Sequence, residues 1–405
     1  MNKFTNLKLQ KKWQQFGNVD IDFHDRLTIL TGANGSGKTT LLNILARHFD
    51  WPSSSLATPR KNVATRLFEW GLGWLADDSN VLGEISYSNG SSIKITTPNI
   101  GSAQYSLELD GRQRVDGFFI PSHRSVFRYE QIDTLPTRST FNKQDAFSKV
   151  AGSLKNRYLG GGDRSSNYYM KEVLISWNIF GHGNPDMPGR EDLLKNFQDF
   201  ESVLRVVLPE SLGFQQLEIR NFEIVLICKT GEFLLDAASG GVSTIVDLAW
   251  QIHMFATEKR ETFSVLIDEV ENHLHPTMQR RILHDLLKAF PMVTFIVSTH
   301  SPLIVSSVKD SKVYALRYRD GEVFSDQLDL IHKARTATEV LDEVLGVSFT
   351  MPIWVEDSLN QITEKYLSKK NISKDDLLMM RNELKEQGLE RLMPEAIYKV
   401  ADKHD

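Results

Sequence analysis

Apolar and polar positions at the start of the chain predict a small sheet, a loop and a helix. Three short apolar runs, Phe4 to Leu9, Val19 to Phe23 and Leu27 to Leu30, have the length and spacing of β-strands. From Lys38 to Phe49 the apolar residues recur at helical intervals, and Trp51-Pro52 ends the segment. We therefore expect the order strand, glycine-containing loop, helix.

The middle of the chain has three successive patterns of apolar and polar residues. Residues 81 to 120 alternate apolar and polar positions around two turn sequences, Asn89-Gly90 and Asp110-Gly111, which predicts an antiparallel β insertion. Residues 130 to 165 are polar and glycine-rich, so we expect a mobile loop there. Helical periodicity at 168 to 180 and 190 to 207 then predicts a helical arm.

Strand and helix patterns alternate towards the end of the chain. Three β segments lie between residues 216 and 235, and the elements predicted after them are a helix at 241 to 255, a strand at 263 to 267, a helix at 277 to 290, a strand at 293 to 297 and a short helix at 303 to 307. Such alternation is typical of a largely parallel sheet flanked by helices. Residues 335 to 405 have helical spacing throughout, interrupted at Pro352 and Pro394.

Composition narrows the class of protein. The chain has 405 residues, 47 Lys and Arg against 52 Asp and Glu, and one cysteine, Cys228. One cysteine excludes a disulfide framework and every zinc site that needs two thiolates. No apolar stretch approaches the roughly 20 residues that cross a bilayer, and the N-terminus lacks an apolar signal segment, so we expect a cytoplasmic protein without membrane contact. The slightly acidic balance means that nucleic-acid binding would need a local basic surface.

A glycine loop carries the strongest chemical signal. The residues Gly32, Ala33, Asn34, Gly35, Ser36, Gly37, Lys38 and Thr39 match G-x-x-x-x-G-K-[ST] at every fixed position. Glycines allow successive backbone N–H groups to surround phosphate oxygens, the lysine reaches the β- and γ-phosphates, and the threonine hydroxyl can bind Mg²⁺. The alternative is a glycine turn that only caps the following helix.

Two predicted strands end in polar groups. The run from Phe263 to Ile267 is followed by Asp268, placed to hold Mg²⁺, and by Glu269, placed to polarise an attacking water. The run from Val293 to Val297 leads to His300, a candidate γ-phosphate sensor. Ser239, Gly240 and Gly241 precede a helix, and by themselves indicate only a turn and an N-cap.

In this order, these motifs resemble the ATP-binding-cassette ATPases of the SMC/RecF/OLD type, and most closely the ATPase subunits of bacterial anti-phage systems such as Septu and PARIS. The resemblance rests on three runs, Leu27 to Leu42, Ile267 to Pro276 and Ser298 to Pro302. It implies an ABC-type P-loop fold and a site for ATP and Mg²⁺ shared by two protomers. Residues from Gly32 to Thr40 of one protomer would hold the nucleotide, and Ser239 to Gly241 of the other would close over it.

The resemblance also assigns roles. It makes Lys38, Glu269 and His300 catalytic and Thr39 and Asp268 the metal ligands. The sequence departs from the family at Val242, where the signature usually has Gln or Glu, and it has no clear Q-loop glutamine. Candidates for that place are Gln104, Gln113, Gln131 and the sequence Ser122-His123-Arg124.

We therefore expect an α/β chain in four parts. Residues 1–130 form the first part of the ATPase domain with an antiparallel β subdomain, and 131–212 a basic loop and helical insertion. Residues 213–334 hold the remaining ATPase motifs, and 335–405 form a helical C-terminal region that either packs on its own ATPase domain or docks a partner protein. Because only 48 residues follow Asp357, we expect no metal-dependent Toprim nuclease domain of the OLD type.

Two further features stay open at the sequence level. His273 and His275 form an H-x-H pair that indicates either a metal site or, by the resemblance, a dimer contact. Residues 121 to 165 hold eight Lys and Arg against four acids, which indicates either a solvated basic loop or a phosphate-backbone contact.

The function that we expect is an ATPase that senses or regulates within an anti-phage system. It would form a homodimer, with a higher oligomer left open, and would control a separate effector such as a nuclease or toxin. One alternative is a RecF-like repair ATPase that binds DNA, with RNA also open as a ligand. Another is a scaffold that binds ATP but hardly hydrolyses it.

Overall fold

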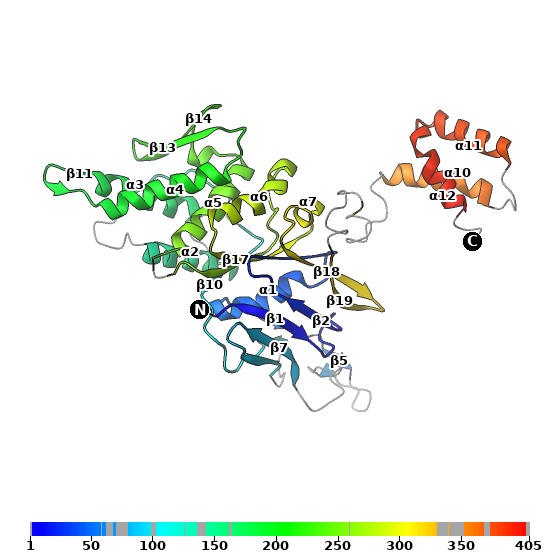
Figure 1. Ribbon diagram of the computed structural model, residues 1–405, viewed down its shortest axis with the longest axis horizontal. Helices are drawn as coiled ribbons and strands as arrows, with labels where there is room; N and C mark the ends of the chain where they lie inside the picture. The colour runs from blue at the N-terminus through cyan, green and yellow to red at the C-terminus, as the bar shows by residue number, and fades with distance from the viewer. Residues whose placement is uncertain are drawn as a thin grey trace. The chain divides into compact units, whose positions relative to one another are not determined.

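The chain forms two compact units, Met1–Val340 and Leu341–Asp405. A computed structural model describes residues 2–57, 59–61, 68–69, 80–98, 103–124, 126–135, 143–161, 164–258, 260–329, 339, 352–367 and 373–401. Figure 1 shows the helices and strands of both units. Each unit is described by itself.

A six-stranded sheet forms the centre of the first unit. Its order is β10 (Gly117–Ile120), β16 (Phe263–Ile267), β17 (Val293–Thr299), β3 (Leu27–Gly32), β18 (Lys312–Arg319) and β19 (Glu322–Gln327). The first five strands are parallel and β19 is antiparallel. Every residue of β3, β16 and β17 is buried, as expected for strands covered on both faces. The predicted parallel sheet is confirmed, and it places the carboxyl ends of these three strands at one edge.

Four of the described helices begin within or just after the motifs. They are α1 (Lys38–Ala46), α5 (Gly240–Phe255), α6 (Pro276–Ala289) and α7 (Pro302–Val305), and α1 continues as the 3₁₀ turn η1 (Arg47–Phe49). Both α6 and α7 begin with proline, whose missing N–H costs nothing at the first helical position. In both helices the preceding residue, His275 or Ser301, caps the N-terminus through its side chain.

A second, antiparallel sheet has the order β2 (Val19–Asp22), β1 (Phe4–Leu9), β7 (Val81–Tyr87) and β8 (Ser92–Thr96). The prediction of one antiparallel insertion over 81 to 120 is therefore wrong in its extent. The hairpin of β7 and β8 completes the sheet begun by β1, whereas β10 pairs in parallel with β16. The short run at β10 is buried at Phe118, Phe119 and Ile120, and such a run does not reveal the direction of its partner.

A helical layer occupies the middle of the chain: α2 (Lys143–Tyr158), α3 (Ser166–His182) and α4 (Glu191–Val207). The helical arm is confirmed, but the mobile loop predicted over 130 to 165 is wrong for residues 143 to 158. The buried stripe of α2 is narrow and contains Ala146, Val150, Ser153 and Leu154, so a mostly polar composition concealed its helical period. The three β segments expected between 216 and 235 form a sheet of β13 (Phe214–Arg220), β14 (Glu223–Cys228) and β15 (Gly231–Leu234), followed by η2 (Leu235–Ala237).

Among its described residues, the first unit also has three two-stranded ladders. They pair β4 (Ser55–Leu56) with β9 (Gln104–Tyr105), β5 (Arg60–Lys61) with β6 (Phe68–Glu69), and β11 (Gly183–Asn184) with β12 (Met187–Pro188). Within the parts of the chain that the structure describes, every helix is too short or too polar to cross a membrane.

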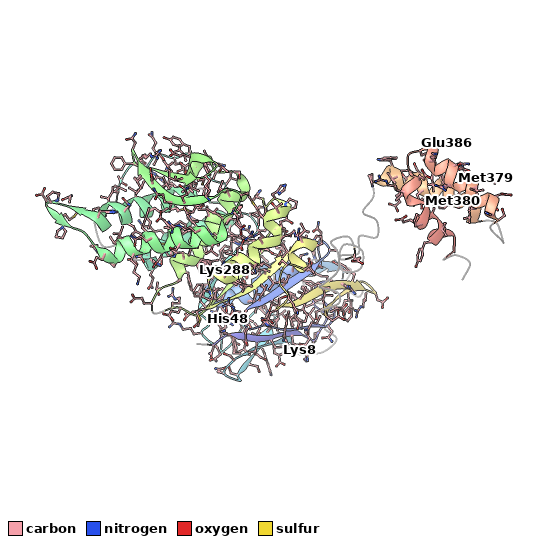
Figure 2. All side chains as sticks on the ribbon, turned by 45° about the horizontal axis from the view of Figure 1, so that its top comes forward. Lys8, His48, Lys288, Met379, Met380 and Glu386 are labelled. Carbon is pink, nitrogen blue, oxygen red and sulfur yellow. The ribbon has the colours of Figure 1, made fainter. Side chains whose placement is uncertain are left out.

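The second unit contains α10 (Ile353–Leu367), α11 (Lys374–Glu386), η3 (Glu390–Leu392) and α12 (Met393–Ala401). Its helices share an apolar core of Val355, Leu359, Ile362, Tyr366, Met380, Leu384, Leu389 and Ala396. Figure 2 labels two neighbours on α11, of which Met380 is buried in this core and Met379 is half exposed. The helical prediction is confirmed for 353–367 and 374–401, and residues 335–338 and 340–351 lie outside the described part.

Candidate active site

The glycine loop between β3 and α1 has a backbone that only glycine fits. Gly32 and Gly37 have φ angles of 144° and 91°, which L side chains rarely adopt. A Cβ atom on Gly32 would lie 2.5 Å from the Leu316 carbonyl oxygen, and one on Gly37 would lie 2.2 Å from the Phe16 ring. These close approaches explain both fixed glycines of the motif.

Lys38 lies folded over this loop. Its Nζ donates to the carbonyl oxygens of Gly32 at 2.9 Å and Ala33 at 3.1 Å, and it lies 3.3 Å from His300 Nδ1. Burial lowers the pKa of Lys38 to about 8, although the nearby carboxylates of Asp268 and Glu269 oppose this shift. A buried ammonium that donates to the carbonyl oxygens of its own loop is suited to exchange them for phosphate oxygens.

Asp268 follows β16 and is held by two hydroxyl groups. Thr39 Oγ1 donates to its carboxylate oxygens at 3.1 and 2.9 Å, and the buried Ser298 Oγ donates to Oδ1. Burial raises the pKa of Asp268, while the hydrogen bonds from Ser298 and Thr39 lower it. The hydroxyl and carboxylate oxygens of Thr39 and Asp268 are the hard ligands that Mg²⁺ prefers.

Glu269 has a strained backbone and an oriented side chain. Its φ angle of 47° lies in the left-handed region, and its N–H donates to Ser298 Oγ at 2.8 Å. Asn272 Nδ2 donates to Glu269 Oε2 at 2.8 Å, and His300 Nε2 lies 3.6 Å from Oε1. One third of the side chain is exposed, so the carboxylate is accessible to water.

His300 follows β17 and lies between Lys38 and Glu269. Its backbone N–H donates to Glu271 Oε1 at 2.5 Å, which fixes the start of the loop after the strand. Burial, and then the charge of Lys38, lowers the pKa of His300. The imidazole is therefore neutral at physiological pH.

The fold thus brings together Lys38, Thr39, Asp268, Glu269 and His300 at one edge of the central sheet. In the rest of the loop, the carbonyl oxygen of Gly35 accepts hydrogen bonds from Tyr318 and Gln15, and Ser36 is buried. Ala33 and Asn34 belong to the same loop, and Thr40 lies in the first turn of α1. Ser239 and Gly240 lie exposed at the N-terminus of α5, and Gly241 packs against Met278.

The three candidate Q-loop glutamines have hydrogen-bond partners outside the motifs. Gln104 donates to Ser54, Gln113 to the Gly111 carbonyl oxygen and Gln131 to Tyr129. Instead, the segment after β10 reaches the site, because Ser122 O accepts from Asn272 and Arg124 binds the backbone after β16.

Two sequence features were left open, the pair His273 and His275 and the basic segment of residues 121 to 165. His275 is the N-cap of α6, and no cluster of three or more His, Cys, Asp or Glu that suits a metal ion occurs among the described residues. In the basic segment, Arg124 points inwards, Lys149 pairs with Glu172 and Arg164 with Asp133. Arg138 and the side chain of Arg157 lie outside the described part.

Four residues that shape the site were not predicted from the sequence in these roles: Ser298, Asn272, Glu271 and Arg124, whose guanidinium donates to backbone carbonyl groups. Three of them lie inside the runs that carry the family resemblance, so their positions were visible but their contacts were not. Ser298, Glu271 and Arg124 act through hydrogen bonds between segments far apart in the chain, and Asn272 joins its local bond to Glu269 with a distant one to Ser122, so no spacing rule predicts these contacts.

Comparisons with known proteins match this chain to ATPase families. A family model described as "AAA domain, putative AbiEii toxin, Type IV TA system" matches residues 197–306, and a second, "AAA domain", matches 10–166. The Septu protein PtuA of Bacillus thuringiensis is 23% identical over 88% of this chain and 87% of its own length. The Retron Ec83 probable ATPase of Escherichia coli is 27% identical over 45% of this chain, but this match spans 34% of that protein.

Among solved structures, an SMC head bound to the C-winged helix domain of ScpA matches 81% of this chain and 98% of its own length, with 18% identity and a TM-score of 0.46. The family models and the curated relatives confirm the resemblance to Septu-type ATPases that the motifs indicate. The chain therefore contains a nucleotide-binding domain of the ATPase type.

Proposed function

We propose that this chain hydrolyses ATP as the regulatory subunit of an anti-phage defence system and controls a separate effector protein. The observation that carries the proposal is the convergence of Lys38, Thr39, Asp268, Glu269 and His300 at one edge of the sheet. The Septu and retron relatives support the defence role.

Nucleotide binding follows from the glycine loop and α1. The backbone N–H groups of the loop and the N-terminus of α1 attract phosphate, and Lys38 adds a positive charge. Thr39 and Asp268 would hold Mg²⁺, which neutralises phosphate charge when it is bound.

Hydrolysis requires a base, and Glu269 is placed to supply it. The hydrogen bond from Asn272 occupies Oε2 and leaves Oε1 to accept a proton from an attacking water. The neutral His300 lies beside Oε1 and can donate to a phosphate oxygen from a ring N–H. Hydrogen bonds fix the backbone N–H groups of both Glu269 and His300, so little reorganisation of these residues precedes the reaction.

A second protomer would complete the site. The exposed N-terminus of α5 presents backbone N–H groups next to Ser239 and Gly240, a geometry suited to phosphate from a facing subunit. On this proposal the isolated protomer is a poor ATPase, and ATP promotes dimer formation.

The first test measures ATP affinity, steady-state hydrolysis and mass in solution for the wild type and three variants. We expect Lys38→Ala to abolish binding, and Glu269→Gln to bind ATP normally, hydrolyse it at least about a hundredfold more slowly and accumulate a dimer. Lys94→Ala, an exposed lysine on β8, is the matched control and should behave as the wild type. Equal hydrolysis by the wild type and Glu269→Gln would refute the assignment of the base and favour the scaffold interpretation.

The second test addresses the effector. Tagged wild type and Glu269→Gln are recovered from the native host, and the co-purified proteins and nucleic acids are identified. A stoichiometric toxin-like or nuclease-like protein, together with loss of phage protection in Lys38→Ala, supports the proposal. ATP-dependent, salt-sensitive DNA binding without a protein partner would instead favour the RecF-like alternative.

A further inference from the structure

Arg124 makes an unusual set of contacts for a residue on a connecting segment. It follows β10, the strand next to β16, and its guanidinium NH2 donates to the carbonyl oxygens of Asp268 at 3.0 Å and Glu269 at 2.9 Å. NH1 lies 3.5 Å from the carbonyl oxygen of Val270. One planar side chain therefore contacts three consecutive carbonyl groups of the catalytic loop, residues 268–273.

These contacts lie where the backbone is strained. The left-handed φ of Glu269 is costly for a residue with a side chain, so surrounding contacts must maintain it. Ser298 holds the N–H of Glu269, and Arg124 holds the carbonyl groups on both sides of the same residue. Together they determine the direction in which the Glu269 side chain leaves the backbone.

We propose that Arg124 is a positioning residue, which holds the backbone of Glu269 in its catalytic orientation. The inference rests on the proposed function in one respect, the role of Glu269 as the base. It adds the side chain that fixes the backbone on both sides of the reacting group.

The test uses the full-length protein and the variants Arg124→Gln and Arg124→Lys. The matched control is Arg128→Gln, which removes the same charge from an exposed residue of the same segment. ATP affinity and kcat are measured together with amide hydrogen exchange in peptides that cover residues 268–273. A residue that only supports folding would change affinity, exchange and thermal stability throughout the domain.

For Arg124→Gln we expect kcat to fall by about tenfold or more while the ATP dissociation constant changes less than about twofold. Exchange should rise in peptides that cover 268–273 and stay unchanged in the glycine loop. Arg124→Lys retains the charge but loses the planar set of donors, so it should recover only part of kcat.

Wild-type kcat and exchange in Arg124→Gln would overturn the inference, and so would a parallel loss of affinity and thermal stability. If Arg124→Gln does not fold, Arg124→Lys decides by the same criteria. If the wild-type protein does not hydrolyse ATP, the proposed function fails, but the exchange data for Arg124→Gln and Arg128→Gln still show whether Arg124 holds the loop.

Discussion

Replacement of Ser298 by alanine tests how the two carboxylates of the site are held. Ser298 is fully buried, donates to Asp268 and accepts from the Glu269 N–H. In Ser298→Ala the charged carboxylate of Asp268 loses a hydrogen bond. The partly buried N–H of Glu269 also loses its acceptor. We expect the free energy of unfolding to fall by about 2–4 kcal/mol. Urea unfolding followed by tryptophan fluorescence measures this change.

The control is Thr294→Val, at the other end of the same strand. Its hydroxyl makes one neutral bond, to the Asp25 carbonyl oxygen at 2.7 Å, so its loss should cost only about 1 kcal/mol. The loss of unfolding free energy in Ser298→Ala should also depend on pH. Burial already raises the pKa of Asp268, and loss of the Ser298 hydrogen bond raises it further.

An acid with a raised pKa destabilises the folded state as pH rises through that pKa, because the charged form is then buried. The deficit of Ser298→Ala should therefore be larger at about pH 7 than at about pH 4. Equal stability losses in Ser298→Ala and Thr294→Val, with no pH dependence, would refute the idea that Ser298 stabilises a buried charge.

Three further predictions follow from the same unit. Gly37→Ala would place a Cβ atom against the buried Phe16 ring, so this variant should lose ATP binding and about 2–4 kcal/mol of unfolding free energy. The control is Gly90→Ala, at a position with positive φ but no clash, which should lose about 1 kcal/mol in urea unfolding. Because the pKa of Lys38 is about 8, its charge is lost above that pH, and ATP affinity measured by calorimetry should fall about tenfold per pH unit there. Lys171→Met would leave Asp236 and Glu223, its partners at 2.7 and 2.6 Å, without their buried cation, and should cost about 3–5 kcal/mol in the same unfolding assay.

The chemistry of the site was predictable because it is encoded locally. The glycine loop and the polar ends of β16 and β17 each occupy a few consecutive residues, and parallel strands bring their carboxyl ends to one edge. The orientation of Glu269 was not predictable, since it depends on Ser298 and Arg124, which lie 29 and 145 residues away in the sequence.

The errors in the fold have a similar origin. The partner of β10 lies in β16, far along the chain, and a short buried run gives no indication of strand direction. No element was predicted over β18 and β19, although Val313 to Leu316 forms an apolar run that becomes the neighbour of β3. Here a signal was present in the sequence and was missed.

The helices α10, α11 and α12 enclose a core of their own. The residues of this core lie between Val355 and Ala396, so the packing of these helices with one another is encoded in one short stretch of sequence. A mutation of one core residue should therefore change the packing of these helices as a group, and the need to keep their apolar side chains matched limits how this stretch can diverge.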